Sequence, residues 1–156
     1  MVGCQPPEFL LNQKFKYDPE LGLFKLAHVL LFDFGSLPST QGDDGDQLDV
    51  LVLLDKLAFV GCLVPARLIG VIEAEQTFEG KITRNDRFLA VAADSSDHQA
   101  VHTIEQIDAH LLGEIDHFFI SYNMLRGKQF TPLGRAGPVR ARQMIEEGRQ
   151  AFADRQ

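Results

Sequence analysis

Four aspartates within seven residues form the densest group of potentially reactive side chains in the sequence. They are Asp43, Asp44, Asp46 and Asp49, and the apolar run 50–54 follows them directly. An ionised carboxylate at the start of a buried strand is costly unless a partner compensates its charge. Because the run contains no basic residue, we expect a bound divalent cation to be that partner.

The spacing of these aspartates allows several oxygen atoms to meet at one point. Asp44 and Asp46 are two residues apart and point to the same side of an extended segment, and Asp49 follows three residues later. Gly42 and Gly45 permit the chain to turn there. Mg²⁺ prefers carboxylate oxygens and keeps several waters that a phosphate ligand can replace. The alternative is an acidic, solvated turn that holds no ion.

The elements that would position these residues are short strands followed by helices. Apolar and β-branched runs predict strands near 23–31, 48–54, 63–75 and 88–93. Several short strands separated by turn residues are typical of a small closed β-barrel.

The last third of the chain is predicted to be helical. Thr103 and Gln106 match a capping box, and the apolar stripe after them predicts a helix that ends near Gly127. A second helix is expected to begin near Pro138 and to run towards Gly148. Strands followed by helices predict a single α+β domain over residues 1–156, with the helices packed outside the barrel.

Composition narrows the possible functions. The net charge of −7 disfavours a nucleic-acid partner, because phosphate backbones are bound by basic surfaces. The same charge argues against the alternative of an OB-like nucleic-acid-binding module. No apolar run approaches the ~20 residues that span a bilayer, so we expect no membrane insertion. The first residues lack the pattern of a signal peptide, and we expect a cytoplasmic location.

The acidic run also resembles a known family signature. Family I soluble inorganic pyrophosphatases share the pattern Asp-Gly-Asp-Pro-hydrophobic-Asp-hydrophobic, which the chain resembles at Asp44-Gly45-Asp46-Gln47-Leu48-Asp49-Val50. Four further blocks resemble the family in order, at 14–24, 68–72, 85–91 and 117–122. The resemblance implies a five-stranded, OB-like closed β-barrel with flanking C-terminal α-helices. It also implies Mg²⁺-dependent hydrolysis of inorganic diphosphate to two orthophosphates by a homo-oligomeric enzyme.

The resemblance assigns roles to single residues. Asp44, Asp49 and Asp86 would be metal ligands, and Asp46 would accept the proton of the attacking water. Lys14 and Tyr122 would contact phosphate and take part in catalysis, and Lys128 would be a further phosphate contact. These roles are those of a multi-metal hydrolysis, in which metal ions activate and orient the attacking water.

Several positions depart from the family pattern, mostly on the phosphate-binding side. The segment between Val29 and Phe34 is shortened, His28 lies near a usual arginine or lysine, and Gln76 lies near a usual aspartate. Phe34 stands at a usual tyrosine, while Phe88 and Asn123 stand at usual basic positions. Losing one donor to transition-state charge can cost ~100-fold in rate. The alternative function is therefore a catalytically impaired homologue that binds metal or phosphate or serves as a structural subunit.

Overall fold

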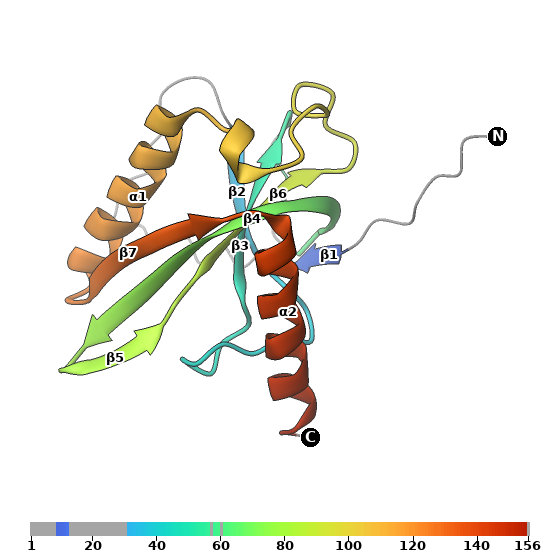
Figure 1. The fold of residues 1–156 in the computed structure, drawn as a ribbon. Helices are drawn as coiled ribbons and strands as arrows, with labels where there is room; N and C mark the ends of the chain where they lie inside the picture. The colour runs from blue at the N-terminus through green and yellow to red at the C-terminus, as the bar shows by residue number, and fades with distance from the viewer. Residues whose placement is uncertain (1–8, 13–30, 57, 60, 156) are drawn as a thin grey trace.

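A mixed β-sheet with one long helix on each side makes up the fold, as Figure 1 shows. The computed structural model describes residues 9–12, 31–56, 58–59 and 61–155, apart from the side chains of 9–12 and 31. The seven strands are β1 (Phe9–Asn12), β2 (Leu31–Ser36), β3 (Asp49–Leu54), β4 (Leu63–Phe78), β5 (Lys81–Arg84), β6 (Arg87–Ala92) and β7 (Gln129–Ala136). The helices are a 3₁₀ turn, η1 (Ile104–Gln106), and the α-helices α1 (Ala109–Met124) and α2 (Pro138–Ala153).

The strand order is β1-β2-β3-β6-β4-β5, with β7 paired to β4. The central strands β3 and β6 run parallel, so that Asp49 lies opposite Arg87. β1 pairs with β4 and also touches β2, where Asn12 lies opposite Ser36. The α+β class and the C-terminal helices are confirmed. The described residues form a seven-stranded sheet, in which β5 and β7 both pair with β4, and the five-stranded closed barrel stays a prediction.

Alternating side chains on the central strands build two apolar cores. On β3, Val50 and Val52 face the core that contains α2, while Leu51 and Leu53 face the core that contains α1. Strand β6 divides in the same way, and every residue of it is buried. Burial on both faces explains why these strands read as continuous apolar runs. Consequently, neighbouring residues where β3 and β6 begin point to different helices.

The start of the first helix differs from the prediction. Thr103 and Gln106 do form a capping box, but they cap only the short η1. The α-helix begins at Ala109, because the Asp108 side chain accepts hydrogen bonds from the backbone N–H groups of His110 and Leu111. The second helix begins at Pro138, as predicted, and continues past Gly148 to Ala153.

The remaining expectations have mixed outcomes. The strands expected near 48–54, 63–75 and 88–93 correspond to β3, β4 and β6. Residues 23–30 of the first expected strand lie outside the described part of the chain. None of the described helices is long and apolar enough to cross a membrane.

Candidate active site

The acidic run forms a tight turn between β2 and β3. Gly42 N–H donates to the Asp46 carbonyl at 2.8 Å, and Gly45 N–H donates to the Gly42 carbonyl at 3.0 Å. Gly45 has a φ of 88°, which a glycine adopts without steric cost. The Asp44 side chain accepts from Asp46 N–H at 3.1 Å. The turn that the glycines were expected to permit is therefore present, and Asp43, Asp44 and Asp46 are exposed on it.

Helix α2 holds this turn in place. Gln41 N–H donates to the carbonyl of Gly148 at 2.9 Å, across the interface between the turn and the helix. A Cβ on Gly148 would lie 2.7 Å from Leu48 Cδ1 and 3.2 Å from the Gln41 carbonyl oxygen. A larger residue would require Leu48 or the Gln41 backbone to shift, so the absence of a side chain at Gly148 permits the close approach of the acidic turn to α2.

Asp49 has an arginine as its partner. Its carboxylate lies 3.0 Å from Arg87 Nη1, on the strand that runs parallel to its own. The sequence suggested a cation because no basic residue lies within the run, but β6 supplies a guanidinium from 38 positions further along the chain. Arg87 therefore compensates the negative charge of Asp49 at the start of β3.

Arg87 is deeply buried beneath the site. Its side chain is 7% exposed, and its guanidinium lies over the rings of Phe119 and Phe130, 4.8 and 5.4 Å from their centroids. Nη1 also donates to the Asn85 side chain and to the Asp86 carbonyl. Burial lowers the pKa of Arg87, and the nearby carboxylates, Asp49 foremost, oppose that shift. Arginine nevertheless stays charged at physiological pH, so a fixed positive charge lies under the aspartates.

Asp86 is held by β4 and β5. Its Oδ1 accepts from Ala74 N–H at 2.9 Å and from Arg84 Nη2 at 2.8 Å. Burial raises the pKa of this carboxyl, an effect that the two donors counteract. Both bonds engage the same oxygen, so within the described residues they leave Oδ2 for another partner.

The three predicted metal ligands surround one cavity of about 400 Å³. Asp44 comes from the acidic turn, Asp49 from β3 and Asp86 from the entry to β6. Helix α2 closes the opposite side with Arg140, Met144, Glu147, Gly148 and Ala151, and Arg84 and Asn85 also line the cavity. Residues far apart in the sequence thus form one polar cavity next to the acidic turn.

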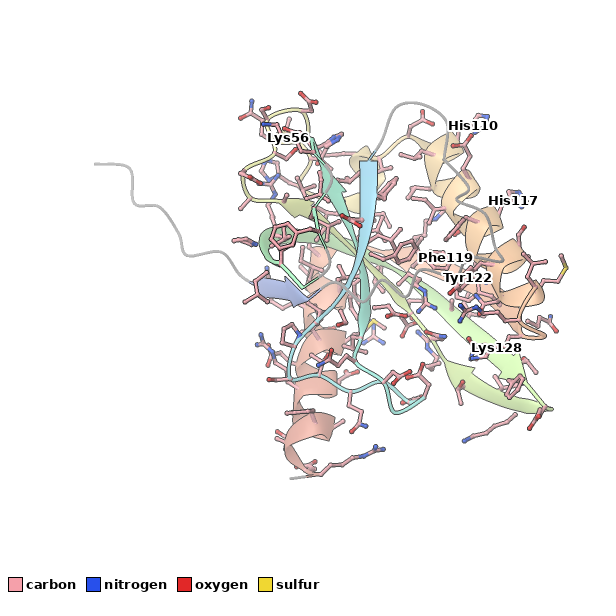
Figure 2. The ribbon with its side chains drawn as sticks, turned by 180° about the vertical axis from the view of Figure 1, so that it is seen from behind. Lys56, His110, His117, Phe119, Tyr122 and Lys128 are labelled. Carbon is pink, nitrogen blue, oxygen red and sulfur yellow. The ribbon has the colours of Figure 1, made fainter. Side chains whose placement is uncertain are left out.

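Other predicted site residues lie elsewhere. Tyr122 and Lys128 are not among the described residues that line this cavity, and neither is Asp46. Tyr122 stacks on Phe118 and has Arg126 over its ring at 4.5 Å; Figure 2 shows it turned towards the sheet. Lys128 lies 5.5 Å from the ring centre of Phe78. Lys14 lies outside the described residues.

Comparison with known proteins identifies the family. The family model described as inorganic pyrophosphatase matches residues 7–153. The chain belongs to the inorganic pyrophosphatase family. The inorganic pyrophosphatase of Geobacillus stearothermophilus is 35% identical over 143 residues, which cover 87% of this chain and 84% of the relative. That of Synechocystis is 33% identical over 149 residues, covering 85% and 86% respectively.

Solved pyrophosphatase structures share the fold. The inorganic pyrophosphatase of Thermus thermophilus superposes with a TM-score of 0.71 at 28% identity, covering 95% of this chain and 89% of that one. The enzyme of Helicobacter pylori gives a TM-score of 0.70 at 29% identity, with coverages of 93% and 89%. The family predicted from the acidic run is confirmed.

Four of the positions that depart from the pyrophosphatase pattern lie in the described part of the chain and are packed within the fold, whereas His28 and residues 29–30 lie outside it. Phe88 is fully buried in the core beneath α2. Phe34 packs edge-on against Phe119, with ring centres 5.5 Å apart. Asn123 is buried and donates to the Phe119 carbonyl, and the buried Gln76 accepts from Asn85. These side chains pack within the fold, so phosphate has to be bound by other side chains.

The described carboxylates have the right chemistry for Mg²⁺ but are not gathered into a ready-made site. Carboxylate oxygens are the ligands that this ion prefers, and Asp44, Asp49 and Asp86 share one cavity. However, two of the three are paired with arginines, and no cluster of three or more acidic, histidine or cysteine side chains able to hold a metal occurs among the described residues. A bound ion would therefore have to share these carboxylates with the arginines or displace them.

Few features of the sequence indicate the basic residues of the site. Arg84 and Arg87 flank Asp86 closely, but a single sequence does not show that one faces the cavity and the other the interior. Arg140 lies in the last helix, far from the acidic run in the sequence, yet it lines the cavity. The one available signal was the presence of two arginines within two positions of a predicted metal ligand.

Proposed function

We propose that the chain hydrolyses inorganic diphosphate to two orthophosphates in an Mg²⁺-dependent reaction. The observation that carries this proposal is the meeting of Asp44, Asp49 and Asp86 around one cavity in a pyrophosphatase fold. These three carboxylates would hold the metal. When bound, Mg²⁺ would supply charge neutralisation for diphosphate and an activated water.

The chain's own residues would supply the remaining steps. Asp46 is exposed on the acidic turn and would accept the proton of the attacking water. Tyr122, Lys128 and Lys14 would donate to phosphate oxygens, Tyr122 through its hydroxyl while its ring stacks on Phe118. The glycine turn and its bond to α2 would orient Asp44 and Asp46 towards the reacting groups.

Phosphate release from diphosphate tests this proposal. We expect wild-type protein with Mg²⁺ to release phosphate, and Asp46→Asn to lower the rate by ~100-fold or more, as for loss of a general base. Glu146→Gln, a change in an exposed ion pair of α2, is the control and should keep the rate. A wild-type rate no higher than that of Asp46→Asn would contradict the proposal.

A second candidate function is favoured by the two arginine–aspartate pairs. If Arg84 and Arg87 keep Asp86 and Asp49 from metal, the chain is an impaired pyrophosphatase that binds metal or phosphate, or a structural subunit. Isothermal titration calorimetry measures Mg²⁺ binding independently of turnover, so the two functions are compared by both measurements. Binding of Mg²⁺ that Asp44→Asn weakens, together with turnover of diphosphate, supports the enzyme; Mg²⁺ binding without turnover, or no Mg²⁺ binding, supports the impaired homologue.

Three further features complete the proposal. We infer an OB-like closed barrel, supported by the pairing of β1 with both β2 and β4. A homo-oligomer and a cytoplasmic location remain proposals from the family resemblance and the sequence. Analytical ultracentrifugation of the purified chain checks the first of these two.

A further inference from the structure

Two arginines at the cavity are held side by side by one glutamate. Arg84 ends β5, and Arg140 lies in the first turn of α2. Glu73 of β4 forms an ion pair with each of them. Its Oε2 lies 2.9 Å from Arg84 Nη2, and its Oε1 lies 3.8 Å from Arg140 Nε. Because the two guanidinium groups use different oxygens of one carboxylate, Glu73 keeps two positive charges together at the cavity wall.

These arginines retain hydrogen-bond donors. A guanidinium carries five N–H groups. In the part of the chain that the structure describes, the ion pairs of Arg84 with Glu73 and Asp86 both use Nη2, which leaves Nη1 and Nε. The contacts of Arg140 to Glu73 and Glu147 are long, at 3.8 and 3.9 Å, and its side chain is 45% exposed. Both groups can therefore reach a ligand without abandoning a short internal bond.

The cavity lining combines negative and positive side chains. Asp44, Asp49, Asp86 and Glu147 line it together with Arg84 and Arg140. The N-terminal turn of α2 adds a partial positive charge beside Arg140. The carboxylates would repel a free diphosphate, while the arginines would repel a free cation. A metal-bound diphosphate can pair with both kinds of side chain.

We propose that Arg84 and Arg140 bind the phosphate groups of metal-bound diphosphate, and that Glu73 is the positioning residue for both. The proposal rests on the proposed function and names its phosphate-binding side chains. Arginine forks match phosphate oxygens in geometry, and such charge-assisted bonds are the stronger class of hydrogen bond. The pair offsets the loss of the basic position that Phe88 now fills with a buried ring.

Binding of methylenediphosphonate, a non-hydrolysable diphosphate analogue, tests the proposal without turnover. Calorimetric titration in the presence of Mg²⁺ should show affinity lowered roughly tenfold or more in Arg84→Ala and in Arg140→Ala, as for one lost bond to a charged group. Arg84→Lys should recover only part of the loss, because the charge returns without the fork.

Matched controls separate binding from general loss of positive charge. Arg135 has the same 34% exposure as Arg84 and pairs with Asp116, and Arg149 on α2 is 44% exposed against 45% for Arg140. Neither control lines the cavity. Arg135→Ala and Arg149→Ala should bind the analogue as wild type does. Equal losses in variants and controls would overturn the proposal.

Glu73→Gln distinguishes a positioning role from a direct one. We expect it to raise KM for diphosphate about threefold to tenfold with a smaller change in kcat, because the arginines remain but are less well placed. An unchanged KM overturns the role of Glu73. Wild-type protein that fails to bind the analogue, or arginine variants that bind it normally, overturns the whole proposal. Arginine-dependent binding without hydrolysis sustains it and refutes the proposed function instead.

Discussion

Arg84 and Arg87 are three residues apart, and each pairs with an aspartate that the sequence marks as a metal ligand. Arg87 points into the core beneath α1, where its side chain is 7% exposed and lies over two phenylalanine rings. Arg84 borders the cavity under α2 with 34% exposure. The same ion pair therefore has different consequences on the two faces of the sheet. A buried guanidinium stabilises the fold, whereas a half-exposed one is available to a ligand.

Removing the buried guanidinium should have the largest effect on stability. Arg87→Met removes the ion pair to Asp49 and the bonds to the Asn85 acceptors, and we expect the free energy of unfolding to fall by about 3 kcal/mol. The value lies at the low end for buried pairs because Asp49 is 44% exposed. Urea unfolding followed by circular dichroism measures it. A loss below about 1 kcal/mol would mean that Arg87 is no more structural than a surface arginine.

Closing the gap between α2 and the acidic turn should have the next largest effect. Gly148→Ala forces Leu48 or the Gln41 backbone to move, and we expect a loss of about 2 kcal/mol in unfolding free energy together with weaker analogue binding. Gly113→Ala in α1 is the control, because nothing lies within 4 Å of its added Cβ. That change should stabilise the protein by up to about 1 kcal/mol. Similar behaviour of both variants would refute the tight approach at Gly148.

Removing the half-exposed guanidinium should barely affect folding. Arg84→Ala should change the free energy of unfolding by less than about 1 kcal/mol, the range for solvated ion pairs. Combined with the expected loss of analogue binding, this result would show that Arg84 contributes to ligand binding, whereas Arg87 contributes to stability. A destabilisation as large as that of Arg87→Met would show instead that both arginines are structural.

The smallest expected effect concerns Asp55, whose carboxylate is stabilised by hydrogen bonds from two serines and not by an arginine. Asp55, just after β3, accepts hydrogen bonds from Ser95 Oγ, Ser96 N–H and Ser96 Oγ. These bonds, with that from Ser95 the largest cause, lower its pKa from 3.8 to about 2. The folded pKa is depressed, so the stabilisation is complete above pH 3.8 and is lost as the pH falls towards 2.

Urea unfolding between pH 6 and pH 2 detects this contribution. The stability of wild-type protein should fall more steeply below pH 4 than that of Asp55→Asn, which carries no titrating group there. Asp154→Asn, at the end of α2, is a control with a solvated carboxylate and should follow the wild-type curve. Parallel curves for wild type and Asp55→Asn would contradict the shifted pKa.

The central strands and the family were predictable because their signals are local. Runs such as Val50–Leu54 and Leu68–Ile72 are apolar on both faces, which is what burial between two helices requires. Strand β7 was not foreseen. Pro132 and Gly134 weaken its strand signal, and it forms because β4 offers a long edge for pairing.

The arginines of the site could not be predicted in the same way. The pair between Asp49 and Arg87 exists because β3 and β6 run parallel in one particular register, and no local pattern encodes that register. The meeting of Arg84 and Arg140 at Glu73 depends likewise on three elements far apart in the chain. The sequence therefore predicted the aspartates of the site, whereas the tertiary structure determines which arginines pair with them.

The bond between Gln41 and Gly148 has a consequence for how the protein is made. Helix α2 follows every strand of the sheet in the chain, yet it supplies one wall of the cavity and anchors the acidic turn. During translation, the aspartates leave the ribosome about a hundred residues before this helix. The nascent chain thus carries its acidic turn without the wall that α2 supplies, and the cavity is complete only once α2 has emerged and docked.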